Sequence, residues 1–281
     1  MKNIKKIASL VLALVLVASL AACGGSGKKE TIKIAVPNDS TNEARALVLL
    51  QVQKVLTLKN TGDALATKAD IADNPNKVEI VEAEAAQIPS ILNDVTYAVI
   101  NSNYAIDAGL TPFVTEGTDV SYPNVVCVKQ GNEDSDITKA LVAAINSKQV
   151  ESFIKDTYTG AIVCDLKDTG DGYDATVDYD ALKGKTIKIG ATPVPHADIL
   201  KVAKDVLAAK GITLETIEYT DYVQPNLVVE DGEVDCNYFQ HDPYLNEFNA
   251  EQKTHLKSIS WIHCEPMGLF GGKQSTLDAL K

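Results

Sequence analysis

The feature that most constrains the fold is a pair of similar segments, each of which opens an alternation of strands and helices. Residues 31–37 read TIKIAVP, and residues 186–193 read TIKIGATP. Short apolar strands alternate with helical patterns after each segment, which is typical of parallel sheets with flanking helices. The sequence therefore predicts an α/β protein with two doubly wound lobes joined by a hinge, and ligands are expected at the carboxyl ends of the strands.

The first candidate site follows the apolar strand 32–36. Asp39, Ser40 and Thr41 are residue types that cap helices, so the next helix is expected to begin here with free backbone N–H groups that attract an anion. Arg45 lies one turn further on and is the single arginine of the sequence. An arginine guanidinium can donate two parallel hydrogen bonds to a planar carboxylate, whereas a lysine ammonium cannot. Arg45 is therefore predicted to bind a carboxylate. An arginine in a solvated surface salt bridge is the alternative.

A second candidate site lies at residues 235–245, where a predicted strand leads into a helix that Asp242 is expected to cap. This stretch concentrates ring side chains between polar residues, namely Tyr238, Phe239, His241 and Tyr244. Rings with a few hydrogen-bonding groups are typical of a small-molecule pocket, and they suit a thioether. A purely structural aromatic cluster is the alternative.

The N-terminus has the composition of an export signal. Lysines in the first six residues precede an apolar run that is too short for a comfortable membrane span, and small residues then lead to Cys23. This end resembles a bacterial lipobox, which implies that residues 1–22 are removed and that Cys23 is lipidated. Residues 23–30 would then tether the protein to the extracytoplasmic face of the cell membrane. A signal peptide with an incidental cysteine is the alternative.

Charge and residue patterns argue against several other functions. A formal net charge of −12 and the absence of a basic patch argue against nucleic-acid binding. The histidines are scattered, so no metal or other cofactor is predicted. No nucleophile motif accompanies His241 and Asp242, so no catalytic residue is predicted and the protein is expected not to be an enzyme. The remaining cysteines are expected to be free thiols, with a disulfide as the alternative: Cys127, Cys164, Cys236 and Cys264.

Several motifs together closely resemble the methionine-binding lipoproteins of bacterial ABC importers. They read PNDSTN (37–42), TPVPHA (192–197), DYVQPN (221–226), FQHDPYL (239–245) and EPMGL (265–269). The resemblance implies a type II periplasmic binding protein-like fold, with L-methionine or a close derivative bound between the lobes. It also implies that the protein delivers its ligand to a membrane permease with a cytoplasmic ATPase. The protein is expected to be a monomer. A different small amino acid, a methionyl peptide, or a surface lipoprotein or adhesin without a transport role are the alternatives.

The resemblance also assigns ligand-binding residues. Those that would hold the amino-acid head group are Arg45, Asn101 and Asn124. Those that would hold the side chain are Tyr222, Phe239, His241 and Tyr244.

The halves occur in the opposite order to that of the family, so the chain resembles a circular permutant. Residues 166–185 are rich in aspartate and glycine without an apolar period, and they are expected to be a solvated linker between the family's usual chain ends. The property that this rearrangement is expected to affect is the stiffness of the hinge between the two lobes. The predicted divisions are 1–22 signal peptide, 23–30 tether, 31–125 lobe with Arg45, 126–165 crossover strand and helices, 166–185 linker, and 186–281 lobe with the aromatic half-site.

Overall fold

The computed structural model describes residues 31–60, 65–117 and 122–280, and within it residues 32–280 belong to one compact unit. The predicted signal peptide, Cys23 and the tether lie outside the described residues. In the described part of the chain, no helix has both the length and the apolar character needed to cross a bilayer.

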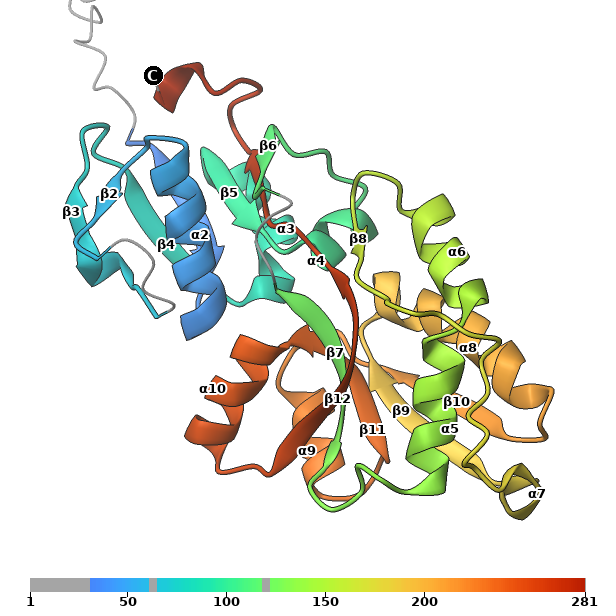
Figure 1. Cartoon of the computed structure of the whole chain (residues 1–281). Coiled ribbons are helices and arrows are strands. Elements are labelled where there is room, and N and C mark those ends of the chain that lie inside the picture. The colour runs from blue at the N-terminus through green and yellow to red at the C-terminus, as the bar shows by residue number, and fades with distance from the viewer. Residues whose placement is uncertain (1–30, 61–64, 118–121, 281) are drawn as a thin grey trace, which may run out of the picture. The chain divides into compact units, whose positions relative to one another are not determined.

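Two mixed sheets dominate the described residues (Figure 1). The first has the strand order β4 (Glu79–Ala83), β1 (Lys33–Pro37), β5 (Tyr97–Ile100), β13 (Gly268–Gly271) and β6 (Val114–Thr115). The second has the order β10 (Thr213–Glu218), β9 (Thr186–Ala191), β11 (Cys236–His241), β7 (Pro123–Lys129), β12 (Leu256–Cys264) and β8 (Val163–Cys164). A small hairpin joins β2 (Thr57–Leu58) and β3 (Ile71–Asp73). These sheets and their helices confirm the predicted α/β class.

Helices and short turns connect the strands. Those that follow strands of the first sheet are α2 (Ser40–Val52), η2 (Ala85–Gln87), α3 (Ile88–Ile91), η3 (Leu92–Asp94), α4 (Ser102–Asp107) and η5 (Asp278–Leu280), while η1 (Lys68–Asp70) lies between β2 and β3. Those of the second sheet are α5 (Asp136–Ile145), α6 (Lys148–Thr157), α7 (Tyr179–Leu182), η4 (Pro193–Ala197), α8 (Asp198–Ala208), α9 (Gln224–Glu230) and α10 (Asp242–Gln252).

Strand β1 shows why the apolar runs become central strands. Ile34, Ala35 and Val36 are fully buried, because one face of β1 packs under α2 and the other under α3. A strand buried on both faces needs a continuous apolar sequence, and parallel neighbours β4 and β5 flank it. The carboxyl ends of β1 and β5 consequently open together at the start of α2 and of α4.

The chain passes from the first sheet to the second between β6 and β7, and it returns between β12 and β13. The returning ribbon is drawn in red in Figure 1. Strand β13 therefore belongs to the first sheet although it lies within residues 186–281, and β7 and β8 join the second sheet. The predicted lobe boundaries do not follow this exchange of strands, and they stay a prediction.

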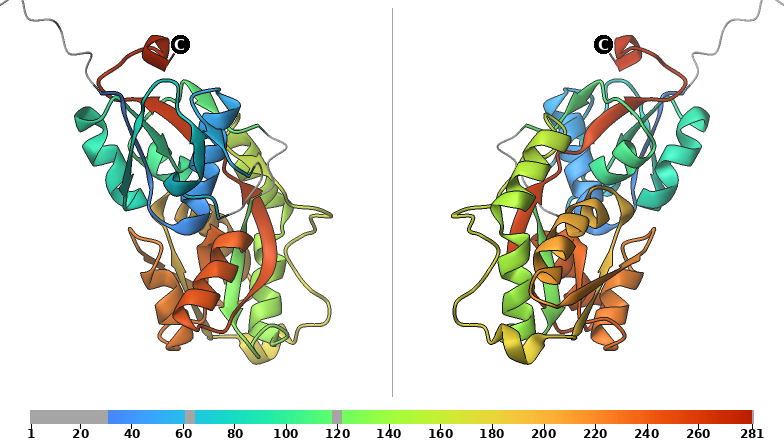
Figure 2. Two further views of the ribbon diagram at one scale, coloured as in Figure 1. Left: turned by 90° about the vertical axis from the view of Figure 1, so that its left-hand side faces the viewer. Right: turned by 90° about the vertical axis from the view of Figure 1, so that its right-hand side faces the viewer.

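The predicted solvated linker is packed against the protein instead. Leu166, Val177 and Leu182 are buried in the same core as α5 and α8. The segment runs along α5 and ends in α7, where the Asp178 backbone N–H donates to Asp136 (Figures 1 and 2). The prediction of a solvated linker is wrong at these positions because isolated apolar residues dock without forming a periodic pattern.

Two glycines of this segment allow its packing to be measured. A Cβ on Gly172 would lie 2.5 Å from Val206 Cγ1, whereas one on Gly184 would have no atom within 4 Å. Both have positive φ, so either alanine costs about 1–2 kcal/mol of unfolding free energy from backbone strain. Gly172→Ala is expected to cost about 1–3 kcal/mol more, from overpacking. Urea unfolding of the two variants measures the difference, and equal losses would show that the segment is loosely attached.

Candidate functional site

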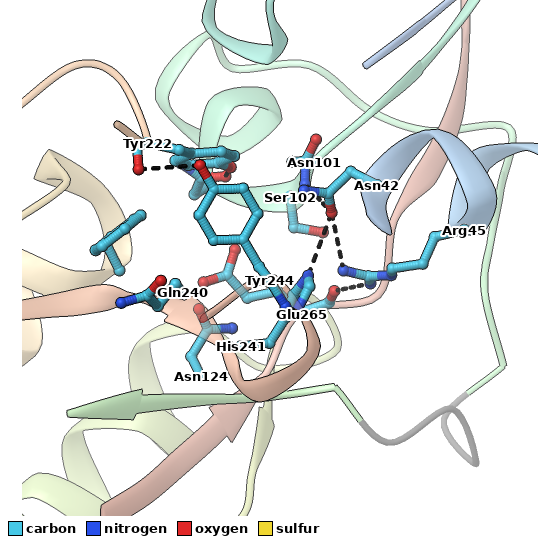
Figure 3. Close-up of a pocket in the computed structure, with 12 residues that line it drawn as sticks. Asn42, Arg45, Asn101, Ser102, Asn124, Tyr222, Gln240, His241, Tyr244 and Glu265 are labelled. Carbon is cyan, nitrogen blue, oxygen red and sulfur yellow. Dashed lines mark hydrogen bonds between the residues drawn. The ribbon is translucent and has the colours of Figure 1, made fainter. Parts of the chain in front are cut away.

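The first part of the site is the beginning of α2, which Asp39 caps as predicted. Its carboxylate accepts the Asn42 backbone N–H at 3.0 Å and the Asn42 side-chain amide at 2.8 Å. The carboxyl group at the helix start is therefore that of Asp39 itself, and burial raises its pKa above the usual value. The Asn42 amide is held so that its Oδ1 accepts from Asn101 Nδ2 (3.0 Å), His241 Nε2 (3.3 Å) and Arg45 Nη1 (3.4 Å). Figure 3 shows these three bonds converging on Asn42.

Arg45 is buried rather than solvated, and its planar fork is already engaged. Its Nε and Nη2 donate to the two carboxylate oxygens of Glu116 at 3.2 and 2.6 Å, and Nη2 also donates to the Glu265 carbonyl at 3.0 Å. Its guanidinium carbon lies 4.2 Å from the centre of the Tyr122 ring. The alternative of a surface arginine is thus wrong, and the predicted bidentate carboxylate contact is made within the chain. Nη1 is the nitrogen directed toward Asn42 and the pocket.

Ring side chains from the second sheet form the opposite wall. Tyr222, Phe239 and Tyr244 lie with ring centroids 5.8–6.1 Å apart. A register shift in β11 between Tyr238 and Gln240 leaves Phe239 without a partner on β7. A bulge of this kind redirects side chains, and it explains how Gln240 donates to Asn237 three positions earlier.

His241, rather than Asp242, caps α10. Its Nδ1 accepts the Tyr244 backbone N–H at 3.2 Å, and Asp242 is the first helical residue, so the predicted cap is wrong by one position. Because Nδ1 accepts, the proton is on Nε2, which donates to Asn42. Burial, and next the charge of Arg45, lower the pKa of His241 well below its usual value, so the imidazole is neutral.

A buried polar cluster supports the base of the site. Glu265 Oε1 lies 2.7 Å from His263 Nε2 and 3.3 Å from His196 Nε2. The other ring nitrogen of His263 bonds the Tyr238 hydroxyl, while that of His196 bonds Thr192 at 2.8 Å. His196 Nε2 also lies 3.1 Å from Asn124 Oδ1.

The charge state of this cluster follows from its surroundings. Burial lowers the pKa of His196 to about 3 despite the neighbouring carboxylate. Burial alone would raise the pKa of Glu265, but His196, His263 and Arg45 together lower it below its usual value. A neutral imidazole therefore faces an ionised carboxylate.

Inspection of the spacing between histidines in the sequence did not reveal this cluster. The ligand atoms of His196, His263 and Glu265 lie within 4.8 Å of one another, which is close enough for a metal ion. Each of these atoms makes hydrogen bonds inside the cluster. His263 and Glu265 are two positions apart, but His196 lies in a different part of the sequence, so spacing between histidines did not reveal the cluster.

All the predicted ligand-binding residues line one pocket. They are Arg45, Asn101, Asn124, Tyr222, Phe239, His241 and Tyr244. The residues that sequence reasoning did not assign are Asn42, Ser102, Asn103, Gln240 and Glu265. Asn42, Gln240 and Glu265 lie inside the motifs that carried the resemblance, so those motifs were the available signal.

Both sheets contribute to the pocket, and hydrogen bonds join their contributions. The Tyr222 hydroxyl donates to Asn103 Oδ1 at 2.6 Å, and the Tyr104 hydroxyl donates to the Thr220 carbonyl at 3.1 Å. Asn103 and Tyr104 belong to α4, which follows β5, whereas Thr220 and Tyr222 follow β10. The polar end and the aromatic end of the pocket are thus held against each other.

Comparison with known proteins places the chain in a family. The sequence model of the NlpA lipoprotein family matches residues 28–165 and 187–281, so the chain belongs to the NlpA lipoprotein family. The unmatched residues between these segments include the predicted linker. The predicted resemblance to methionine-binding lipoproteins is confirmed by relatives such as the D-methionine-binding lipoprotein MetQ of Salmonella typhi. That relative is 38% identical over 48% of this chain and 52% of its own length.

Other relatives match over similar lengths. Outer membrane lipoprotein 3 of Mannheimia haemolytica is 38% identical over 48% of this chain and 53% of its own length. The structure of a nutrient binding protein from Burkholderia cenocepacia bound to methionine is 43% identical, covers 47% of this chain and 59% of that one, and has a TM-score of 0.44. The chain thus spans about half the length of the curated relatives it matches.

The four described cysteines that were predicted to be free are free: Cys127, Cys164, Cys236 and Cys264. Burial raises the pKa of the Cys236 thiol well above its usual value, which keeps it protonated and unreactive.

Proposed function

We propose that this chain is the substrate-binding lipoprotein of an ABC importer and that it binds free L-methionine in the pocket between the two sheets. The observation that carries the proposal is the pocket itself, whose polar end holds Arg45 and Asn101 and whose opposite wall holds Tyr222, Phe239 and Tyr244. A methionine zwitterion needs both charges matched once water is excluded, and its thioether makes favourable contacts with rings.

The chemistry of the pocket fits binding without reaction. Both histidines nearest to it, His196 and His241, are kept neutral by burial, and the polar side chains hold one another in fixed positions. We propose that the ligand is bound by closure of the two halves, handed to the membrane permease unchanged, and transported by the associated ATPase. Lipid on Cys23 would keep the monomeric protein at the extracytoplasmic face of the membrane.

The order of the halves remains part of this proposal. The family model matches both halves, while each relative quoted above matches about half the chain over about half its own length. This is expected if the halves are permuted, because a collinear alignment then includes one half at a time.

Denaturing the purified protein and analysing the released small molecules by mass spectrometry tests the function directly. Methionine is the expected product. Calorimetry on ligand-free protein with L-methionine, D-methionine and methionine sulfoxide then ranks the candidates. A protein that releases no methionine and gives no binding heat with any of the three would refute the proposal.

The aromatic wall yields a prediction about selectivity. Tyr244→Ala removes a ring that packs on Tyr222 and Phe239, so methionine affinity is expected to fall about 10- to 100-fold. The affinity for norleucine, which lacks the sulfur, is expected to fall less. The ratio of methionine affinity to norleucine affinity therefore decreases. Tyr179→Ala, which removes a ring outside the pocket, is the control and is expected to keep both affinities. If Tyr244→Ala kept the parent ratio of methionine to norleucine affinity, the Tyr244 ring would not contact the ligand side chain.

A further inference from the structure

A second and larger cleft lies beside the binding pocket, and two tyrosines separate the cleft from the pocket. Exposed residues line the cleft, among them Asn38, Glu84 and Glu251, whereas the described residues that line the pocket are buried or half-buried. Within the described part of the chain, Tyr222 and Tyr244 alone line both. A small molecule that passes from the cleft into the pocket therefore meets these two side chains.

Tyr244 is the fixed member of the pair. It lies in the first turn of α10, where its backbone N–H donates to His241 Nδ1 at 3.2 Å. Its ring packs in a buried cluster with Phe239 and Phe248, at a centroid distance of 6.1 Å from each. Displacing this ring would disturb the packing of α10, so Tyr244 forms the frame of the opening.

Tyr222 is held by contacts that can be released. It belongs to residues 219–223, a connection between β10 and α9 that has neither helical nor strand backbone. Its carbonyl accepts from the Tyr244 hydroxyl at 3.1 Å, and Figure 3 shows the two rings next to each other, away from Arg45. Segments of this kind move more readily than the helices and strands that they connect.

Helix α4 of the other half of the pocket fastens this segment. The Tyr222 hydroxyl donates to Asn103 Oδ1 at 2.6 Å, and the Tyr104 ring lies 5.0 Å from the Tyr222 ring. Burial raises the pKa of Tyr222 well above its usual value, so the hydroxyl keeps its proton and remains a donor. The Asn103 side chain is buried as well. If the Tyr222 ring moves out toward the cleft, this hydrogen bond breaks, so the bond belongs to the closed arrangement.

We infer that Tyr222 is a gate between the cleft and the pocket, that its hydrogen bond to Asn103 latches the gate, and that this latch limits the length of the ligand side chain. The inference rests on the proposed methionine-binding function and adds Asn103 to it as a specificity-determining residue. A methionine side chain that ends at the ring wall leaves the gate closed. A longer side chain would pass between the rings into the cleft, hold the gate open and lose the latch.

Tyr222→Phe tests the latch because it removes the hydroxyl and keeps the ring. Isotope-labelled methionine is expected to dissociate about 3- to 10-fold faster into an excess of unlabelled methionine, since one hydrogen bond of the closed arrangement is lost. S-butylhomocysteine has a side chain three methylene groups longer. It is expected to bind the parent protein more weakly than methionine, and to dissociate at the same rate from the parent and the variant. The ratio of methionine affinity to S-butylhomocysteine affinity therefore decreases in Tyr222→Phe.

Two further variants assign the effect to one bond. Asn103→Ala removes the acceptor and is expected to accelerate methionine dissociation as Tyr222→Phe does. The double variant Tyr222→Phe/Asn103→Ala is expected to be no faster than either single variant, because all three lose the same bond. Tyr219→Phe removes a hydroxyl from the same segment, outside the lining of both the pocket and the cleft, and is expected to keep the parent rates. Thermal melting without ligand shows that each variant is folded.

Three results would overturn the gate while the methionine function stands. The first is an unchanged rate of methionine dissociation from Tyr222→Phe. The second is an equal acceleration of both ligands, which would make Tyr222 a part of the wall only. The third is equal affinity of the parent protein for methionine and S-butylhomocysteine. If the parent protein binds no methionine, the proposed function and the gate are both refuted.

Discussion

Replacing Arg45 with alanine is expected to abolish measurable methionine binding, with a loss of at least about 100-fold in affinity. The guanidinium is the one buried cation among the described pocket residues, and its Nη1 faces the interior. A ligand carboxylate that enters the pocket without it would stay unpaired in a water-poor site. Titration calorimetry of the parent and variant proteins measures the loss.

The same replacement is also expected to destabilise the protein, and this second effect has to be separated from the first. Without Arg45, the Glu116 carboxylate remains buried beside the Met267 backbone N–H, at a cost of about 3–5 kcal/mol. The double variant Arg45→Ala/Glu116→Gln removes that buried charge. It is expected to recover much of the unfolding free energy in urea but none of the affinity.

Glu116→Gln alone completes this experiment. Its amide oxygen can accept from Met267 and from Arg45, so it is expected to retain methionine binding within about tenfold. If the double variant regained methionine binding together with stability, Arg45 would be a structural residue and the proposed head-group site would be wrong.

Lowering the pH from 7 to 5 is expected to reduce the unfolding free energy steeply. The folded protein holds the pKa of His196 near 3 and that of His241 well below 6.5, mainly because both are buried. Between these values and 6.5 the unfolded chain binds more protons than the folded protein, so stability rises with pH and is lost on acidification. His196 contributes about 2 kcal/mol to the loss between pH 7 and pH 5, and His241 adds to it in the same direction.

Urea unfolding at a series of pH values measures this loss, and histidine variants assign it. His196→Gln is expected to reduce the loss of unfolding free energy between pH 7 and pH 5 by about 2 kcal/mol, even if the variant is less stable at pH 7. His255→Gln removes an exposed histidine and is expected to keep the steep dependence. Glu265 acts at lower pH, because the stability that its lowered pKa supplies is lost only as that carboxylate becomes protonated. A parent protein whose stability does not change between pH 7 and pH 5 would contradict the buried neutral imidazoles.

Much of this architecture follows from local sequence. The run 32–36 predicts β1 within one residue at each end, and Asp39 caps α2 because its side chain is short enough to reach back to the first turn. Ser135 caps α5 in the same way, because its hydroxyl accepts the Thr138 backbone N–H. The location of the site at strand ends was predictable because the carboxyl ends of parallel strands meet at the same edge of a sheet.

The features that sequence reasoning missed depend on distant partners. Glu116 is 71 positions from Arg45, and nothing in its own neighbourhood distinguishes it from a surface carboxylate. The cluster of His196, His263 and Glu265 is assembled by η4 and by the end of β12, so spacing along the chain could not reveal it. Val177 was assigned to a solvated linker because one buried side chain makes no period.

The contact between Glu116 and Met267 has a consequence for how the chain is connected. Glu116 precedes the passage into the second sheet, Met267 follows the return from it, and a 2.7 Å hydrogen bond joins them. The entry and exit of residues 123–264 are therefore neighbours in space, as in a domain inserted at a single point of its host. Relocating the chain termini within the host leaves the internal connections of such an insertion intact.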